Sequence, residues 1–190
     1  MRKQSLLAIA TALSGCISLP AIAQGYPAKP IRLMVGFAPG GGTDIVARVL
    51  AQKLSETWGQ QVVVENRAGA TGTIAADFVA KSAPDGYTLL MGHVNSNAIA
   101  PTLFKKLPYD AVKDFASVTY VGYVPNVLTV HPSLPTKNVK ELIALAKTRA
   151  GELTCASSGT GSTQHLALEM FMTITGTKII HGPYKGSGQA

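Results

Sequence analysis

The sequence predicts an α/β fold in which two domains are each built on a parallel sheet. Its first half alternates apolar runs of strand length with stretches of helical spacing, which indicates right-handed crossovers between parallel strands. Residues 118–130 are nearly continuous β-type sequence and are expected to cross between the domains. Another strand, a glycine-rich turn and a helix then follow within residues 153–171. We therefore expect a first domain over residues 24–124 and a second, incomplete domain over 125–190.

The first unit places a helix directly after a glycine-rich turn. Residues 31–37 form an apolar run, the turn follows at 39–42, and helical spacing begins at Thr43. Thr43 or Asp44 is expected to cap this helix with a side-chain oxygen. The spacing predicts one apolar face made of Ile45, Val46, Val49, Leu50 and Leu54.

A glycine-rich turn that leads into a helix can bind an anion. The first amides of the helix lack internal partners, and the aligned peptide dipoles place about half a positive charge there. The same arrangement recurs at residues 157–163, so two helix starts could hold a doubly ionised ligand between them. The alternative is that each turn needs its glycines only for its shape.

The rest of the first half completes a strand–helix–strand–helix–strand pattern. Residues 61–65 and 87–91 are predicted strands, and Thr71 or Thr73 is placed to cap the helix between them. The regular pattern lapses over residues 92–115. His93 to Asn97 follow the third strand, so they are expected at the same edge of the sheet as the first glycine-rich turn.

The second half repeats the pattern with fewer elements. A helix is predicted over residues 139–149 and a strand over 153–156, followed by a helix that carries His165 and a strand that starts at 178–181. A sheet of two strands is short for a domain, and we therefore expect the chain to be a fragment of a longer protein.

The charge balance points away from nucleic acid. The chain has 17 Lys and Arg against 10 Asp and Glu, but the basic residues are scattered and aromatic residues are only 6%. A modest, diffuse positive field suits small anionic ligands at least as well.

The N-terminus carries an export signal. Arg2 and Lys3 precede an apolar segment that ends in Ala21-Ile22-Ala23, which predicts a secretory signal peptide over residues 1–23. Leu13-Ser14-Gly15-Cys16 also fits a lipobox, so lipidation of Cys16 is the alternative. Because the apolar run is short for a membrane span, we expect an exported, periplasmic domain.

The motifs give little support to catalysis. The chain has no P-loop and no G-x-S-x-G sequence, and its four histidines lack the spacing of a helical zinc pair. Ser162 and His165 could form a nucleophile and base, but no carboxylate is obviously placed to orient the ring. We expect no catalytic residue, no metal and no cofactor, with a secreted hydrolase as the alternative.

A series of motifs resembles one family along the whole chain after the signal. Its segments, in order, are YPAKPI at 26–31, FAPGGGTD at 37–44, VENRAGA at 64–70, PDGYTL at 84–89, LPYD at 107–110, SSGTGS at 157–162, HL at 165–166 and PYKG at 183–186. They are similar to the Bug-type solute-binding proteins, the extracytoplasmic receptors of tripartite tricarboxylate transporters.

This resemblance implies a type II periplasmic-binding-protein fold that closes on a small carboxylate. It further implies a monomer that serves the membrane subunits of a tripartite tricarboxylate transporter. The loops that match the family's binding loops imply the following ligand-binding residues: Phe37, Pro39, Gly40, Gly41, Gly42, Thr43, Asp44, His93, Asn95, Ser157, Ser158, Gly159, Thr160, Gly161, Ser162, Thr163, His165 and Tyr184.

The departures from the family pattern leave alternatives open. Gly182 stands where the family usually has a branched apolar residue, and the strands that would return to the first domain are missing. A truncated, non-functional product and a receptor that reports to a sensor both remain possible.

Overall fold

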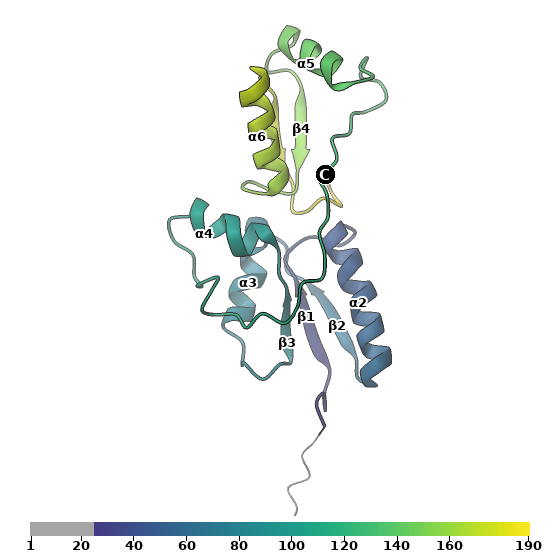
Figure 1. Cartoon of the computed structure of the whole chain (residues 1–190), viewed down its shortest axis with the longest axis vertical. Coiled ribbons are helices and arrows are strands. Elements are labelled where there is room, and N and C mark those ends of the chain that lie inside the picture. The colour runs from purple at the N-terminus through teal and green to yellow at the C-terminus, as the bar shows by residue number, and fades with distance from the viewer. Residues whose placement is uncertain (1–24) are drawn as a thin grey trace, which may run out of the picture.

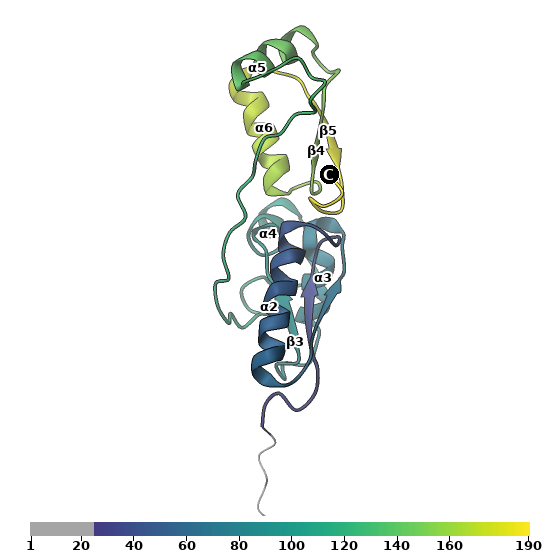
Figure 2. The same ribbon diagram turned by 90° about the vertical axis from the view of Figure 1, so that its right-hand side faces the viewer.

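A computed structural model describes residues 25–190 and has two lobes, one above the other along the long axis (Figure 1). The first lobe lies below and carries the early elements, while the green and yellow elements form the second lobe (Figure 2). The chain comes back to the junction of the lobes at its end (Figure 1). The predicted signal peptide, with Cys16 and Ala23, lies outside the described residues.

The first lobe is built on a three-stranded parallel sheet with the order β2-β1-β3. Strand β1 (Ile31–Val35) lies in the middle, between β2 (Val62–Asn66) and β3 (Thr88–Met91). Ile31 pairs with Val62, and Arg32 pairs with Thr88 on the other side. The predicted α/β class and parallel pairing are therefore confirmed.

Helices connect these strands in the predicted order. The first is α2 (Gly42–Trp58), and α3 (Thr73–Ala80) follows a short turn, η1 (Ala70–Gly72). Gly59 ends α2 in the left-handed conformation that favours glycine, with φ of 65°.

The second lobe repeats the arrangement of parallel strands connected by helices, with fewer elements. It contains α5 (Val139–Thr148), β4 (Thr154–Ser157), α6 (Thr163–Thr175) and β5 (Ile180–Pro183). Strands β4 and β5 run parallel, with Cys155 opposite His181. Asn138 caps α5 by accepting the Glu141 amide, and Gly176 ends α6.

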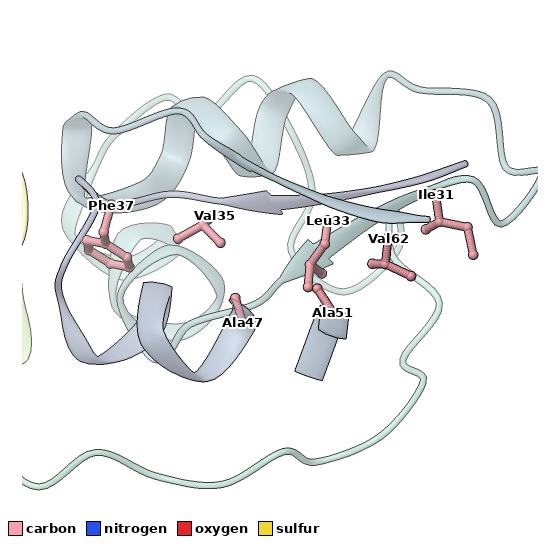
Figure 3. Packing of buried hydrophobic residues seen from close by; sticks show 7 residues of the cluster. All are labelled: Ile31, Leu33, Val35, Phe37, Ala47, Ala51 and Val62. Carbon is pink, nitrogen blue, oxygen red and sulfur yellow. The ribbon is translucent and has the colours of Figure 1, made fainter. Parts of the chain in front are cut away.

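The core of the first lobe lies between β1 and α2 (Figure 3). Residues of β1 that face the helix meet alanines of α2, and Phe37 extends this layer past the end of the strand (Figure 3). The cluster consists of Ile31, Leu33, Val35, Phe37, Ala47, Ala51 and Val62.

The predicted apolar face of α2 is wrong for Ile45, Val46 and Val49, whereas Leu54 packs against the core. Ala47 and Ala51 face the sheet, whereas Ile45 and Val49 are more than half exposed, at 55% and 59%. Val46 is also exposed, and Leu50 and Leu54 are half-buried. The short alanine side chains let the helix lie close to the sheet, whereas the pattern of the larger apolar residues predicts a different buried face.

The predicted side-chain caps of α2 and α3 are wrong as well. The residues that precede these helices are Gly41 and Gly72, and neither helix has a side-chain cap. Asp44 lies in the first turn of α2 and reaches back to the Gly40 amide instead. Thr73 Oγ1 likewise bonds backward, to the carbonyl oxygen of Ala70.

Two stretches of the chain differ in structure from what the sequence predicts. Residues 92–115, predicted to be irregular, contain a wide helical turn, η2 (Asn95–Ile99), which continues into α4 (Ala100–Leu103). The segment 118–130 (hereafter the crossing segment) forms no strand, and its apolar side chains are exposed. A strand needs a hydrogen-bonded neighbour, and none lies beside the crossing segment among residues 25–190.

Candidate functional site

A cavity of about 370 Å³ opens where the two lobes meet. The ends of β1 and β5, the turn before α3 and the loop before α6 all contribute to it. Its lining consists of Gly36, Phe37, Gly69, Ala70, Thr71, Phe104, Ser158, Gly159, Thr160, Pro183, Tyr184 and Lys185. A cavity of this volume is in the range that holds a small organic molecule.

The lining suits a small anion with an apolar body. Phe37, Phe104 and Tyr184 supply aromatic surface, while Lys185 is the one basic residue and no acidic residue takes part. A carboxylate entering the cavity would therefore meet no like charge from the lining itself.

The turn before α3 is held in a strained conformation. Ala70 and Thr71 have φ values of 44° and 59°, a region that branched side chains rarely adopt. Thr71 Oγ1 donates to the Thr160 carbonyl oxygen of the other lobe at 2.6 Å. Backbone strain of this kind often marks a binding site, and here it brings Thr71 to the cavity.

The loop before α6, residues 157–162, is hereafter the ligand loop, and most of its amides are already bonded. The Ser158 amide donates to Gln164 Oε1 at 2.7 Å, and the Gly161 amide to His165 Nδ1 at 3.1 Å. The Gly159 amide donates to Ser157 Oγ at 3.1 Å. Among the described residues neither the Thr160 amide nor the Ser158 hydroxyl has a partner, so both are available at the cavity.

Ser162 does not form a catalytic pair with His165. Ser162 is fully buried, and its Oγ caps α6 by accepting the backbone amide of His165 at 3.2 Å. The His165 ring turns instead to the Gly161 amide and to Glu169. Since the hydroxyl is neither accessible nor bonded to the ring, the geometry gives no support to the hydrolase alternative.

The predicted anion site at the start of α2 lies outside the cavity. A side chain at Gly41 would meet Ser187 Oγ at 2.9 Å, and one at Gly42 would meet Val124 at 3.2 Å. The end of the chain thus covers this helix start, and the Ala38 amide donates to the Lys185 carbonyl oxygen at 2.9 Å.

Asp44 anchors the first glycine-rich turn. Its buried carboxylate accepts from Arg48 Nε at 2.9 Å, from the Gly40 amide at 3.0 Å and from Asn66 Nδ2 at 2.8 Å. The Arg48 hydrogen bond, followed by those from Gly40 and Asn66, lowers the pKa of Asp44 to about 2 against the opposing effect of burial. With three protein donors, this carboxylate acts on the shape of the turn.

His93 and Asn95 lie behind the cavity wall. The His93 ring packs edge-on against Phe37, with ring centroids 4.9 Å apart, and burial lowers its pKa. Asn95 is 1% exposed, and its Oδ1 accepts the Thr163 amide of the other lobe at 3.2 Å. Both residues therefore support the wall and the junction of the lobes.

The cavity brings together a minority of the predicted site residues. Those that line it are Phe37, Ser158, Gly159, Thr160 and Tyr184. Those that do not are Pro39, Gly40, Gly41, Gly42, Thr43, Asp44, His93, Asn95, Ser157, Gly161, Ser162, Thr163 and His165.

Sequence reasoning missed several lining residues. Thr71 stands in the glycine-rich turn after β2, and since β2 is a neighbour of β1 the sheet-edge rule could have found it. Lys185 follows β5 in the same way. Phe104 lies in the stretch predicted to be irregular, where no sequence pattern indicated that it would line a cavity.

Residues 25–190 contain neither a metal-binding cluster nor a helix that could span a membrane. No three His, Cys, Asp or Glu residues in this range are grouped so that they could hold a metal ion. None of the described helices has the length and apolar character needed to cross a membrane.

The family follows from a comparison with known proteins. Residues 46–190 match the family model described as "Tripartite tricarboxylate transporter family receptor". The chain belongs to this receptor family. The resemblance expected from the motifs is therefore confirmed.

Individual relatives agree with the family. Protein BugT of Bordetella pertussis is 45% identical over 190 residues, which is all of this chain and 58% of the relative. The structure "R. palustris Rpa4515 with adipate" is 43% identical with a TM-score of 0.84, covering 86% of this chain and 55% of the other. MatC from Rhodopseudomonas palustris with bound malate is 34% identical with a TM-score of 0.79, over 86% and 56% of the two chains.

These matches also establish the fold. A further similar structure is titled as that of the periplasmic binding protein BugD, and it is 34% identical with a TM-score of 0.73 over 86% of this chain and 55% of the other. The predicted periplasmic-binding-protein fold of this receptor-family chain is therefore confirmed. The chain spans about half the length of the relatives it matches.

Proposed function

We propose that this receptor-family chain captures a small carboxylate in the cavity between its lobes. The observation that carries the proposal is the lining, which combines Lys185, a free Ser158 hydroxyl and a free Thr160 amide with no acidic residue. Two similar structures hold adipate and malate by their titles, and both ligands are dicarboxylates that a cavity of about 370 Å³ can accept.

The contacts can be assigned by chemistry. A carboxylate is an acceptor only, so it requires donors, and the Ser158 hydroxyl, the Thr160 amide and the Lys185 ammonium are donors of three kinds. Phe37, Phe104 and Tyr184 would then cover the carbon chain of the ligand. No metal or cofactor is needed for such binding.

The family name implies the partners and the place. We propose that the chain acts outside the cytoplasm, in the periplasm, as a monomer that presents its ligand to the membrane subunits of a tripartite tricarboxylate transporter. The predicted export signal in residues 1–23 supports this location, and nucleic acid is not a proposed partner.

The decisive experiment is a calorimetric titration of the chain with malate and with adipate at pH 7.5. We expect saturable binding without turnover. Ser158→Ala removes one donor that has no partner within the described residues, so it should weaken binding about fivefold with an unchanged melting temperature. Ser117→Ala, at an exposed serine away from the cavity, is the matched control and should bind as the wild type does.

Absence of binding to every mono-, di- and tricarboxylate tried would refute the proposal. So would conversion of the ligand into a product, because a receptor returns its ligand unchanged.

A further inference from the structure

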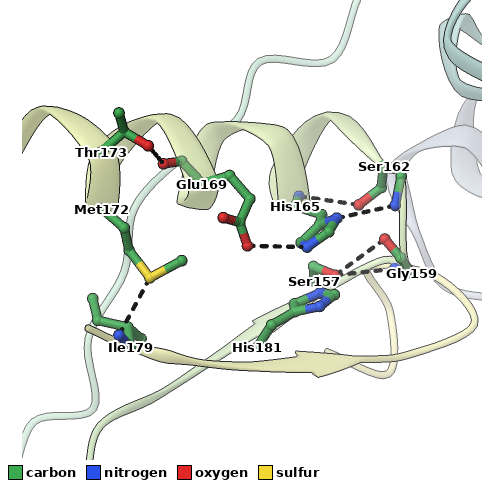
Figure 4. Close-up of polar contacts among 10 residues, drawn as sticks. Ser157, Gly159, Ser162, His165, Glu169, Met172, Thr173, Ile179 and His181 are labelled. Atoms are coloured by element: carbon green, nitrogen blue, oxygen red, sulfur yellow. Dashed lines mark hydrogen bonds and ion pairs between the residues drawn. The ribbon is translucent and has the colours of Figure 1, made fainter. Parts of the chain in front are cut away.

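The ligand loop begins with a buried serine that a histidine of β5 contacts. Ser157 is 1% exposed, and its Oγ lies 2.6 Å from His181 Nε2 (Figure 4). The same Oγ accepts the Gly159 amide at 3.1 Å and lies 3.3 Å from the Gly159 carbonyl oxygen. The amide of Gly159, a residue of the cavity lining, thus depends on this hydroxyl, while the Gly159 carbonyl oxygen accepts the Ser162 amide at 3.1 Å.

A second histidine reaches the ligand loop from α6. The His165 ring stacks on the His181 ring with centroids 3.9 Å apart and an angle of 18° between the planes (Figure 4). His165 Nδ1 accepts the Gly161 amide at 3.1 Å. The two rings therefore bond to the loop on either side of Thr160.

The hydrogen bonds assign the tautomers of both rings. Since the Gly161 amide donates to His165 Nδ1, that nitrogen carries no proton, and Nε2–H faces Glu169 Oε1 at 3.3 Å. The Gly159 carbonyl oxygen lies farther from Ser157 Oγ, at 3.3 Å, and already accepts the Ser162 amide, so we assign the Ser157 hydrogen to His181 Nε2 at 2.6 Å. With this assignment His181 is neutral and carries its proton on Nδ1.

We propose that His181, acting through Ser157, is a positioning residue for the ligand loop. It fixes the Ser157 hydroxyl, the hydroxyl fixes Gly159, and Gly159 sets the direction of the Ser158 side chain and the Thr160 amide on its two sides. The inference rests on the proposed function and extends it, because neither His181 nor Ser157 lines the cavity.

The surroundings of the ring keep it in the neutral form that this role requires. Burial first, and the His165 ring second, lower the pKa of His181, while Glu169 acts in the opposite direction. From β4 the facing titratable group is the Cys155 thiol, whose pKa is raised by burial, so it stays uncharged. The ring can therefore accept a hydrogen bond at neutral pH.

The test distinguishes the loss of the hydrogen-bond acceptor from the loss of the volume of the His181 ring. His181→Leu fills part of the space but accepts no hydrogen bond, and Ser157→Ala removes the hydroxyl. Each should weaken malate or adipate binding about fivefold, and the double variant should be no weaker than either single one because the two act in series. His181→Gln keeps a neutral acceptor, so its affinity should stay within about twofold of wild type.

The chain offers a matched control outside the cavity. His131 Nδ1 lies 2.7 Å from Ser133 Oγ, an exposed pair of the same chemistry. His131→Leu should leave binding unchanged. If His181→Gln binds as weakly as His181→Leu, the ring acts by packing alone and the proposal is overturned.

A measurement without ligand keeps this inference separate from the proposed function. Nitrogen-15 NMR should give His181 Nε2 the shift of an unprotonated ring nitrogen, and His181→Leu should speed hydrogen exchange at the Gly159 amide while His181→Gln should not. Unchanged Gly159 exchange in His181→Leu would overturn the positioning role. Failure of the wild type to bind any carboxylate, with these NMR results intact, would overturn the proposed function only.

Discussion

Asp44 illustrates how a residue can be important for a reason other than the predicted one. The predicted helix cap does not form, because the side chain lies in the first turn of α2 and bonds to Gly40, Arg48 and Asn66. Asn66 Nδ2 also donates to the Phe37 carbonyl oxygen at 3.0 Å. The network therefore ties the end of β2 to the cavity wall, which no local pattern could reveal because Asn66 is distant in sequence.

Replacing Asp44 should cost stability in a pH-dependent way. Its pKa falls from 3.8 to about 2 on folding, which corresponds to about 2 kcal/mol. The depressed pKa means that this stabilisation is present above about pH 4 and is lost as the pH falls through about 2. Urea unfolding should therefore show Asp44→Asn about 2 kcal/mol less stable at pH 7 and nearly equal to wild type at the acid end.

Glu56→Gln is the control for Asp44, because Glu56 pairs with Lys53 on the exposed surface of the same helix. It should change stability little at either pH. A deficit of Asp44→Asn that was equally large near pH 2 would contradict the assignment.

At the scale of the element, α2 shows the limit of reading a helix by its largest apolar residues. Ile45 and Val49 are spaced as a buried stripe, yet Ala47 and Ala51 form one with the same spacing and face β1. The period predicted that a helix would form, and the observed bounds Gly42–Trp58 agree. The period alone could not decide which stripe faces the sheet, because that depends on how closely the helix approaches.

Enlarging each stripe tests which face is buried. Ala47→Leu would force extra volume between α2 and β1, where Ala47 is fully buried, and should destabilise the chain by about 2 kcal/mol. Val49→Lys, at a position 59% exposed, should change stability by less than about 0.5 kcal/mol. Urea unfolding of both variants gives the answer, and the reverse order would restore the face predicted from the sequence.

At the scale of the molecule, the sequence predicted the individual strand–turn–helix units better than the way in which the two lobes pack together. Strand–turn–helix units can be recognised from the periodicity of apolar residues and from glycine-rich turns, so both parallel sheets were predictable. The cavity depends on Thr71, Phe104 and Lys185, which come together only when the lobes meet. The crossing segment was predicted to be β-type for its composition, but a strand forms only where a partner lies beside it.

Direct bonds join the two lobes around the cavity. Thr71 Oγ1 bonds to the Thr160 carbonyl oxygen at 2.6 Å, and Asn95 Oδ1 to the Thr163 amide at 3.2 Å. Because the exposed crossing segment is the direct covalent connection, we expect these contacts to hold the lobes in their observed arrangement (Figure 2). Thr71 and Thr160 line the cavity, so the arrangement of the lobes and the shape of the site should change together.

The double variant Thr71→Val/Asn95→Ala tests this coupling. Valine keeps the shape of threonine and removes the hydroxyl, and alanine removes the acceptor for the Thr163 amide, so the lobes should separate. Small-angle X-ray scattering should show a larger radius of gyration than in the wild type, with helix content by circular dichroism preserved. Thr71→Ser retains the hydroxyl and should scatter as the wild type does. An unchanged radius in the double variant would mean that backbone contacts such as Ala38 to Lys185 hold the lobes without help from these side chains.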